Sequence, residues 1–216
     1  MLGWDAMQNE IDLIVGLGNP GTQYLTTRHN AGFWFIDLLS QKHTGTFRTE
    51  KRFHGDVAQI VIDNRRIWLL KPQTYMNESG RSVEAITTYY NISLENTLIA
   101  HDDLDLRPGR TKLKFAGGHG GHNGLRDVIR CVGNVFWRLR LGIGHPGPGQ
   151  REIVTDYVLK RASGEDEIKI LDAIGSAMEI MPIFLQHGED RAKNLLHKQG
   201  AEINLDQESD ESSTQE

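Results

Sequence analysis

The sequence predicts an α/β fold: a single domain with a mixed, partly parallel β-sheet wrapped by helices. Short apolar runs alternate along the 216 residues with segments of helical period, which is typical of helices layered on a sheet. Two β-type runs flank the turn residues Asp63 and Asn64, which indicates a hairpin and therefore some antiparallel pairing. Neither an internal repeat nor a linker interrupts the pattern, so one domain is expected.

The first half of the chain should supply three strands and two helices. Residues 13–17 (LIVGL) are apolar without alternation and end at glycines, as in a strand buried on both faces. From Asn30, a possible cap, to Lys42, apolar residues recur at helical spacing. The remaining elements expected here are the hairpin strands 57–62 and 67–70 and a helix over about 78–90.

The second half continues the alternation. A strand over residues 97–100 runs into His101, Asp102 and Asp103, so polar groups gather at its carboxyl end. Residues 111–115 alternate apolar side chains with two lysines, which predicts a half-buried strand with one wet face. After the glycine-rich loop 117–124, we expect a helix over 125–132, a strand over 136–143 and a long helix near 164–187.

Charge is spread unevenly along the chain. The formal net charge is −5, and residues 206–216 hold five acidic residues and no basic one. Removing those five charges from −5 leaves residues 1–205 neutral, so the overall charge does not exclude RNA as a partner. We expect a domain over residues 11–198, a separate N-terminal extension over 1–10, and a disordered acidic tail over 199–216.

Several classes of protein are disfavoured by simpler features. No stretch approaches the roughly 20 apolar residues of a membrane span, and the N-terminus lacks the regions of a signal peptide. The chain is therefore expected to be cytoplasmic, and Met7 is an alternative natural start to Met1. The single cysteine, Cys131, lies in an apolar-periodic run and should be a buried structural thiol.

Three other kinds of site are disfavoured by their motifs. Residues 16–21 (GLGNPG) match the dinucleotide pattern GxGxxG, but the residues that follow have no helical period and no acidic residue ends a second strand about 20 positions later. His119 and His122, with His29 and His101, could suggest a metal, but no HExxH-type motif completes a site. The chain contains no GxSxG, so water is the expected nucleophile.

Histidine, aspartate and asparagine residues gather at strand ends and glycine-rich turns. Ligands of open α/β sheets bind at such carboxyl ends. Hydrolysis of an ester by water needs a base of near-neutral pKa, a carboxylate that orients it, and neutral donors for the oxyanion. The residues that could fill these roles are Asn19, His29, Asn77, Asp102, His122 and Asn123.

Five blocks of the sequence, in this order, resemble the bacterial-type peptidyl-tRNA hydrolases: LIVGLGNPGTQYLTTRHNAGF, KPQTYMNESG, AHDDLDLRPG, GGHGGHNGLRD and RLRLGIGHPG. The resemblance covers about residues 11–198. It implies one mixed sheet wrapped by helices and an enzyme that cleaves the ester joining a peptide to the 3′ end of tRNA. It implies no cofactor, and the incomplete ligand set described above predicts no metal.

The resemblance also implies roles for individual residues. His29 is similar to the catalytic base and Asp102 to the carboxylate that orients it. Asp103 stands where a glutamate is familiar in the family, and the chain is about two residues shorter between Gly133 and Arg140. The further implied positions are Asn19, Asn77 and Asn123 as substrate-positioning amides, Tyr24, Tyr75, Met76 and His122 as cleft residues, and Lys114 and Arg140 as contacts to a tRNA phosphate.

The expected mechanism has neutral His29 take a proton from the water that attacks the ester, while Asp102 stabilises the imidazolium. An amide then holds the oxyanion, Asn123 being the first choice and Asn19 the second. The expected partner is peptidyl-tRNA, with a monomeric enzyme and no obligate protein partner. Two rival functions stay open at this point: a noncatalytic RNA-binding module and a nicotinamide enzyme.

Overall fold

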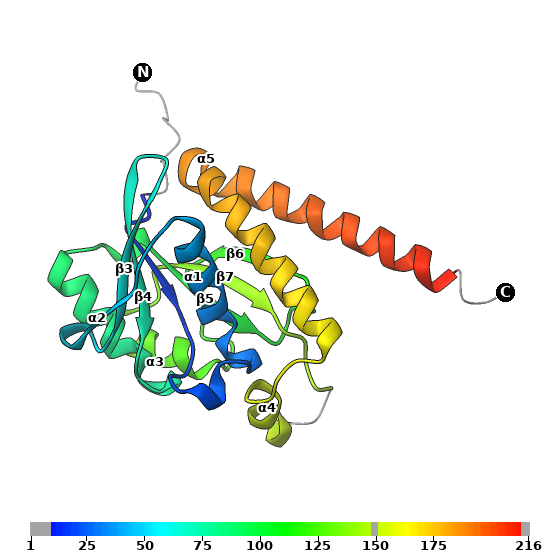
Figure 1. Cartoon of the computed structure of the whole chain (residues 1–216), viewed down its shortest axis with the longest axis horizontal. Helices are drawn as coiled ribbons and strands as arrows, with labels where there is room; N and C mark the ends of the chain where they lie inside the picture. Colours follow the sequence, from blue (N-terminus) through cyan, green and yellow to red (C-terminus); the bar gives the residue numbers. More distant parts are fainter. Residues whose placement is uncertain (1–9, 148–150, 213–216) are drawn as a thin grey trace.

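A seven-stranded mixed sheet forms the centre of the molecule, with the strand order β2-β3-β4-β1-β5-β7-β6 (Figure 1). The computed structural model describes residues 10–147 and 151–212. Strand β1 pairs in parallel with β4 and β5, and β5 pairs in parallel with β7, whereas the other pairs are antiparallel. The predicted mixed sheet is thus confirmed. The strands are β1 (Leu13–Gly16), β2 (Arg48–Glu50), β3 (Gly55–Ile62), β4 (Arg65–Pro72), β5 (Thr97–Asp103), β6 (Thr111–Phe115) and β7 (Trp137–Gly142).

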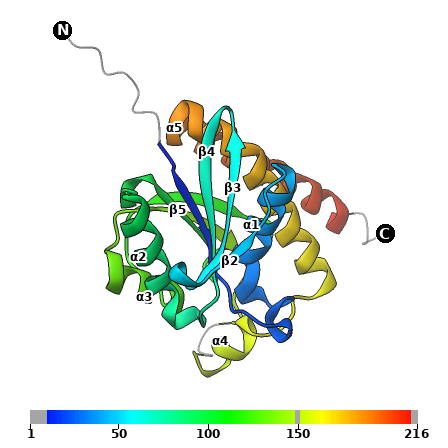
Figure 2. The same ribbon diagram turned by 60° about the vertical axis from the view of Figure 1, so that its left-hand side comes forward.

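Helices cover both faces of this sheet. Side chains of α1 and α5 pack on one face, and side chains of α2 and α3 pack on the other. Figures 1 and 2 both place α4 beyond the carboxyl end of β1, at one end of the molecule. The helices are α1 (Ala31–Lys42), α2 (Ser79–Tyr90), α3 (Asn123–Val132), α4 (Arg151–Val158) and α5 (Gly164–Ser212).

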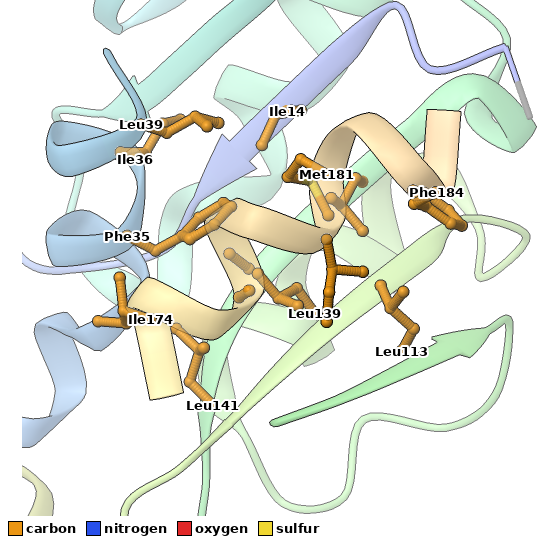
Figure 3. Packing of buried hydrophobic residues seen from close by; sticks show 14 of the residues in the cluster. Ile14, Phe35, Ile36, Leu39, Leu113, Leu139, Leu141, Ile174, Met181 and Phe184 are labelled. Atoms are coloured by element: carbon orange, nitrogen blue, oxygen red, sulfur yellow. The ribbon is translucent and has the colours of Figure 1, made fainter. Parts of the chain in front are cut away.

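The continuous apolar run of β1 is explained by this layering. Leu13 and Val15 pack with α2 and α3, whereas Ile14 packs with α1 and α5. Since successive side chains of a strand point to opposite faces, a strand segment with a core on each side, such as residues 13–15, carries apolar residues in succession. Figure 3 shows the α1 and α5 side of the core, where each fully buried side chain contributes about 1.5–3 kcal/mol. Its labelled residues include Ile14, Phe35, Leu139, Ile174 and Phe184.

Helix α1 lies unusually close to the sheet at its first turn. A Cβ atom on Gly32 would lie 2.5 Å from the carbonyl oxygens of Leu17 and Ala100, and a Cβ on Gly16 would lie 2.3 Å from the Gly32 oxygen. Only glycine permits this approach at Gly16 and Gly32. The contact fixes the start of α1, and with it the turn before it, against the carboxyl ends of β1 and β5.

The predicted hairpin is confirmed, and its turn has the expected chemistry. Asp63 and Asn64 both have positive φ angles, 48° and 65°, as in the two-residue turns whose twist matches paired strands. Strand β5 is longer than predicted and ends at Asp103 instead of Ala100, so His101 and Asp102 lie within the strand. Strand β2 and helix α4 were not predicted, because they have only three and eight residues.

The last helix differs from the prediction. Gly188, with a φ angle of 76°, interrupts α5 directly after the predicted helix end at His187, but helical backbone then resumes and continues to Ser212. Helix α5 therefore extends over residues 199–212, most of the acidic tail for which disorder was predicted. The side chains of residues 197–212 lie outside the described residues, as do residues 1–9 of the predicted N-terminal extension.

Cys131 was expected to be a buried structural thiol, and no segment was expected to span a membrane. Cys131 is partly buried at the contact between α2 and α3, where its Sγ would lie 2.7 Å from a Cβ on Gly80, and burial raises the pKa of its thiol. Within the described ranges, no helix combines the length and the apolar character needed to cross a bilayer.

Candidate active site

A cleft of about 1180 Å³ opens at the carboxyl ends of the parallel strands. This is the edge of the sheet at which open α/β proteins bind their ligands. Of the eleven site residues that the sequence predicted, ten line this cleft, whereas Tyr24, on the short turn 22–24, does not. The ten are Asn19, His29, Tyr75, Met76, Asn77, Asp102, Lys114, His122, Asn123 and Arg140.

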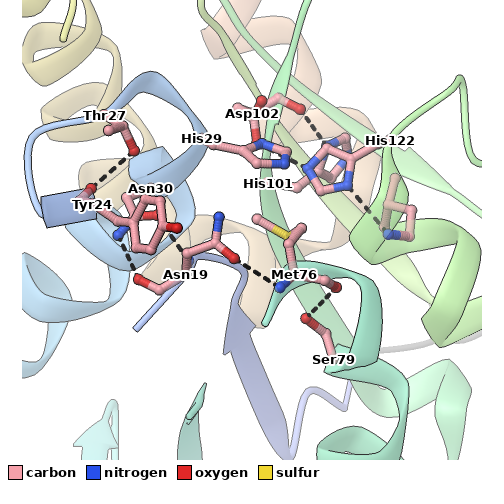
Figure 4. Close-up of polar contacts among 11 residues, drawn as sticks. Asn19, Tyr24, Thr27, His29, Asn30, Met76, Ser79, His101, Asp102 and His122 are labelled. Carbon is pink, nitrogen blue, oxygen red and sulfur yellow. Dashed lines mark hydrogen bonds and ion pairs between the residues drawn. The ribbon is translucent and has the colours of Figure 1, made fainter. Parts of the chain in front are cut away.

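His29 and Asp102 form a buried hydrogen-bonded pair. His29 lies on the 3-10 turn Arg28–Asn30 just before α1, and its Nδ1 is 2.9 Å from Asp102 Oδ1 (Figure 4). Their exposed fractions are 8% and 2%. Because an ionised carboxylate only accepts hydrogen bonds, Nδ1 must carry the proton, which leaves Nε2 of neutral His29 as the basic nitrogen.

A second histidine uses the same oxygen of Asp102. His122 Nε2 is 2.8 Å from Asp102 Oδ1, and its Nδ1 accepts the N–H of Leu125 at 3.2 Å, which makes His122 the N-cap of α3. A backbone N–H can only donate, so the proton of neutral His122 is on Nε2 and is directed at Asp102. His122 is therefore a fixed donor, whereas His29 keeps a free acceptor nitrogen.

The electrostatics of the pair follow from this geometry. Burial alone would raise the pKa of Asp102, but His29 and His122 outweigh it and hold that pKa far below its usual range. Burial lowers the pKa of His29, yet the charge and hydrogen bond of Asp102 leave it raised above the usual value. An ionised carboxylate thus stands behind an imidazole whose protonated form it stabilises.

His101 is a third histidine in the cluster, and it has a different state. Its Nδ1 lies 2.7 Å from the Asp102 carbonyl oxygen and must donate, while its Nε2 is buried without a partner among the described residues. Burial, with a smaller effect of His122, lowers the pKa of His101 to about 4. The His101 ring meets His122 edge to face at 5.2 Å and is neutral at physiological pH.

Asn19 is held in one orientation by three hydrogen bonds. Its backbone N–H donates to Asn30 Oδ1 at 2.8 Å, and its backbone oxygen accepts from Asn30 Nδ2 at 3.0 Å. Its side-chain Oδ1 accepts the N–H of Met76 at 2.8 Å, so Nδ2 is the amide atom left to donate (Figure 4). Asn30 was expected to cap α1, but its side chain makes no capping bond and holds the Asn19 loop instead.

The other two predicted amides lie on the rim of the cleft. Asn77 and Asn123 are exposed, and the Oδ1 of Asn123 accepts from Arg126 at 2.7 Å. Tyr75, 59% exposed, stands on the same rim, whereas the neighbouring Met76 is buried beneath it.

Basic side chains form a further wall. Arg140 donates to Asp103 at 2.7 Å and is partly buried, whereas Lys114 is exposed. Sequence reasoning missed Arg138, a buried residue whose guanidinium donates to the carbonyl oxygens of Gly117 and Gly118. Burial and the nearby Arg140 lower the pKa of Arg138. Arg138 thereby holds the glycine-rich loop that leads to His122.

The cluster could also be read as a metal site. One ligand atom from each of His29, Asp102 and His122 lies within 4.8 Å of the others. Both imidazoles direct N–H groups at the carboxylate, however, so a metal ion between them would have to displace both protons. Hydrogen bonds within the trio satisfy the same atoms without an ion.

The chain is similar in sequence to known peptidyl-tRNA hydrolases. The family model described as peptidyl-tRNA hydrolase matches residues 13–204. A peptidyl-tRNA hydrolase of Neisseria gonorrhoeae (strain NCCP11945) is 46% identical over 192 residues, which cover 88% of this chain and 99% of the relative. One of Stenotrophomonas maltophilia (strain K279a) is 49% identical over 186 residues, which cover 86% and 96%.

The structural comparison agrees. A crystal structure of peptidyl-tRNA hydrolase from Acinetobacter baumannii matches this structure with a TM-score of 0.84 and 46% sequence identity. The match covers 88% of this chain and 95% of that one.

Proposed function

This chain belongs to the peptidyl-tRNA hydrolase family, a family of hydrolases that act on the ester bond of peptidyl-tRNA, and from that premise we propose that His29 is its general base. Neutral His29 takes a proton from water through Nε2 as the water attacks the ester carbonyl. Asp102 fixes the tautomer of His29 and stabilises the imidazolium that forms. The imidazolium then gives its proton to the 3′ oxygen of the tRNA as the ester bond breaks, so the products are free tRNA and the released peptide.

The observation that carries this proposal is the sharing of one oxygen, Asp102 Oδ1, by two histidines. Sharing keeps the carboxylate ionised and fixes the tautomers of both rings. His122 has both nitrogens occupied, so it cannot take a proton from water without giving up a hydrogen bond. His29 is the one of the two with a nitrogen left for that task.

We assign the oxyanion donor to Asn19 ahead of Asn123, which reverses the order expected from sequence. Both amides have an occupied Oδ1 and can donate through Nδ2. Asn19 is 7% exposed, its backbone is held by the Asn30 side chain and its Oδ1 by the Met76 N–H, whereas Asn123 is exposed and held by one surface arginine. A donor fixed before the reaction stabilises developing charge better than one that must be ordered during it.

Lys114 and Arg140 are proposed to bind a phosphate of the tRNA. Both line the same cleft as His29, so a phosphate held there keeps the substrate next to the base. Asp103 takes one side of the Arg140 guanidinium and fixes its direction, and the remaining N–H groups can donate to a phosphate.

The enzyme is proposed to need neither a metal nor a cofactor, because His29 and Asp102 together supply the base. We further propose that it works in the cytoplasm as a monomer without an obligate protein partner, its partner being peptidyl-tRNA. Tyr75, Met76 and Asn77, which line the cleft, are proposed substrate contacts, and the role of Tyr24, which does not line it, stays a prediction.

A release assay tests this function directly. The wild-type chain is incubated with N-acetyl-aminoacyl-tRNA, with and without EDTA, and free tRNA is measured. Turnover is expected to be the same in both arms. Binding without release would favour the noncatalytic RNA-binding module, and loss of activity with EDTA that zinc restores would contradict water activation by imidazole alone.

A further inference from the structure

The turn that carries His29 also carries two other contacts. Arg28, His29 and Asn30 form a single 3-10 turn, in which successive side chains point about 120° apart because there are three residues per turn. His29 reaches Asp102 and Asn30 reaches the Asn19 loop, as described above. The third side chain, Arg28, reaches in another direction, toward α4.

Arg28 is bound to the end of α4 by its guanidinium. Nη1 donates to the carbonyl oxygens of Tyr157 at 3.3 Å, Lys160 at 3.3 Å and Arg161 at 2.9 Å. The guanidinium lies 4.1 Å from the centre of the Tyr157 ring, and Nη2 is 3.9 Å from Asp166. Arg28 is 8% exposed, so these groups replace most of its water.

Chemistry explains why an arginine fits this position. The last carbonyl groups of a helix have no partner within the helix, and they form the negative end of its dipole. The planar guanidinium bonds these oxygens through Nη1 while it stacks on the Tyr157 ring and reaches Asp166 through Nη2, a combination that a single ammonium group cannot make. The backbone adds to the junction, since the Arg28 N–H donates to the Lys160 oxygen at 3.2 Å.

Helix α4 is a wall of the cleft. Val154, Thr155 and Val158 of α4, with Leu159 after it, line the same cavity as His29. Besides the contacts of Arg28, two features tie α4 to the rest of the structure: Val158 is buried in the α1 and α5 side of the core, and the Tyr157 hydroxyl donates to the Ile143 oxygen at 2.8 Å. Figures 1 and 2 show that α4 stands apart from the layered body.

We propose that Arg28 is a positioning residue that fixes α4, one wall of the substrate cleft, to the turn carrying the base. This inference rests on the proposed function in one respect: it takes His29 to be the base next to which α4 holds the substrate. Loss of the Arg28 contacts loosens the wall, whereas His29 stays in place through Asp102 and through the Asn30 contacts. Substrate binding therefore suffers more than the chemical step.

The test compares Arg28→Lys with Arg161→Gln. Arg28→Lys keeps the charge and the backbone contacts. It loses the planar guanidinium, and with it the stacking on Tyr157. Arg161→Gln is the matched control, because it removes a cation from the same segment but only breaks an exposed pair with Glu167. Hydrogen exchange is followed over residues 151–161, with α2 as an internal reference, and KM and kcat are measured on N-acetyl-aminoacyl-tRNA.

For Arg28→Lys, exchange over residues 151–161 should rise about tenfold or more, as loss of hydrogen bonds to a charged group implies. KM should rise with kcat nearly unchanged, while Arg161→Gln changes neither. Tyr157→Leu is a second variant, for use if Arg28→Lys folds poorly. It leaves the 28–30 turn intact and should show the same rise in exchange over residues 151–161.

Two results would overturn the proposal. One is unchanged exchange over residues 151–161 in Arg28→Lys and in Tyr157→Leu. The other is a rise in exchange that is equal in α2, since that reports general loss of stability. The exchange readout does not depend on catalysis, so it still judges the proposal if His29 proves not to be the base.

Discussion

Among single residues, the three histidines around Asp102 differ in what their nitrogens can do. His122 has both nitrogens occupied, His101 has a buried Nε2 that cannot reach water, and His29 has one nitrogen paired and one that faces the cleft. Burial and pairing, more than residue type, therefore separate the proposed base from its neighbours.

His29→Ala should lose turnover by roughly 10²- to 10⁴-fold, the usual contribution of a general base, because no neighbour can replace its free nitrogen. Binding of tRNA should persist, since the basic wall is untouched. Single-turnover release and tRNA binding are measured side by side. A variant that kept more than about a tenth of wild-type kcat would show that the base has been misassigned.

Asp102→Asn should lower turnover by less than His29→Ala, and it should also move the pH profile. The base must be neutral to act, so kcat/KM of the wild type should rise with pH through the raised pKa of His29, above pH 6.5. The Asp102 charge causes that rise in pKa, so its removal should shift the acidic limb to lower pH. A limb at the same pH in both proteins would contradict the electrostatic role of Asp102.

His101 should make the protein less stable in mild acid. Its folded pKa of about 4 lies below the usual 6.5, so between these values the unfolded chain binds the extra proton. The free energy of unfolding should therefore fall as pH drops from 6.5 toward 4, by up to about 1.4 kcal/mol per pH unit. His29, with a raised pKa, is protonated in both states over that range and adds little slope.

His101→Gln, which does not titrate, is the comparison. Urea unfolding between pH 7 and pH 5 should show a flatter dependence in the variant than in the wild type. Equal slopes in the two proteins would mean that His101 takes up its proton without unfolding, and the buried Nε2 would then need another explanation.

Among the elements, the contact between α1 and the sheet is the one that fixes the site. Gly32→Ala should destabilise the protein by about 1–3 kcal/mol, since its methyl group would overlap two backbone oxygens that cannot move aside. Gly175→Ala is the matched control within α5, where a Cβ meets nothing within 4 Å; it should stabilise by about 0.5–1 kcal/mol. Denaturant midpoints measure both, and a neutral Gly32→Ala would mean that α1 can shift.

Much of the fold could be predicted because the pattern of each element is local. The apolar run of β1 predicts a strand buried on both faces, and Asp63–Asn64 predicts a hairpin turn, each from residues adjacent in the sequence. Helix α4 was not predicted, because its eight residues span only about two turns and the Arg28 contacts that hold it come from a distant part of the chain. Arg138 was missed for the same reason, since its partners are carbonyl groups of a remote loop.

The site was predicted as a list of residue types at strand ends, and their grouping followed from the sheet. The sharing of Asp102 Oδ1 by two histidines could not be predicted, because it depends on β5 extending past Ala100 and on the cap of α3. The order of Asn19 and Asn123 as donors likewise depends on burial, which the spacing of residues does not contain.

For the whole molecule, charge distribution matters more than net charge. Lys114→Ala should raise KM and leave kcat nearly unchanged, because a phosphate contact attracts the ground and transition states alike. It should also lower the log–log salt slope of kcat/KM by about 0.7–0.9, measured between about 50 and 200 mM salt. Arg140→Ala should act in the same direction, but it also leaves Asp103 without its partner.

Lys169→Ala is the control for this experiment, since Lys169 pairs with Glu165 on α5 and does not line the cleft. It should leave KM and the salt slope unchanged. A collapse of kcat in Lys114→Ala with an unchanged salt slope would place Lys114 in the chemistry or the fold, and the phosphate site would have to be sought elsewhere.

The position of β1 in the sheet has a consequence for how the chain is made. Of the strands that the structure describes, β1 leaves the ribosome first, yet its two neighbours, β4 and β5, are synthesised much later. The β3–β4 hairpin needs only its own turn and can form early, whereas parallel pairing of β1 must wait for distant segments and is slow. Until then the apolar run 13–17 has no partner, so during synthesis this central strand is the segment most in need of protection from aggregation.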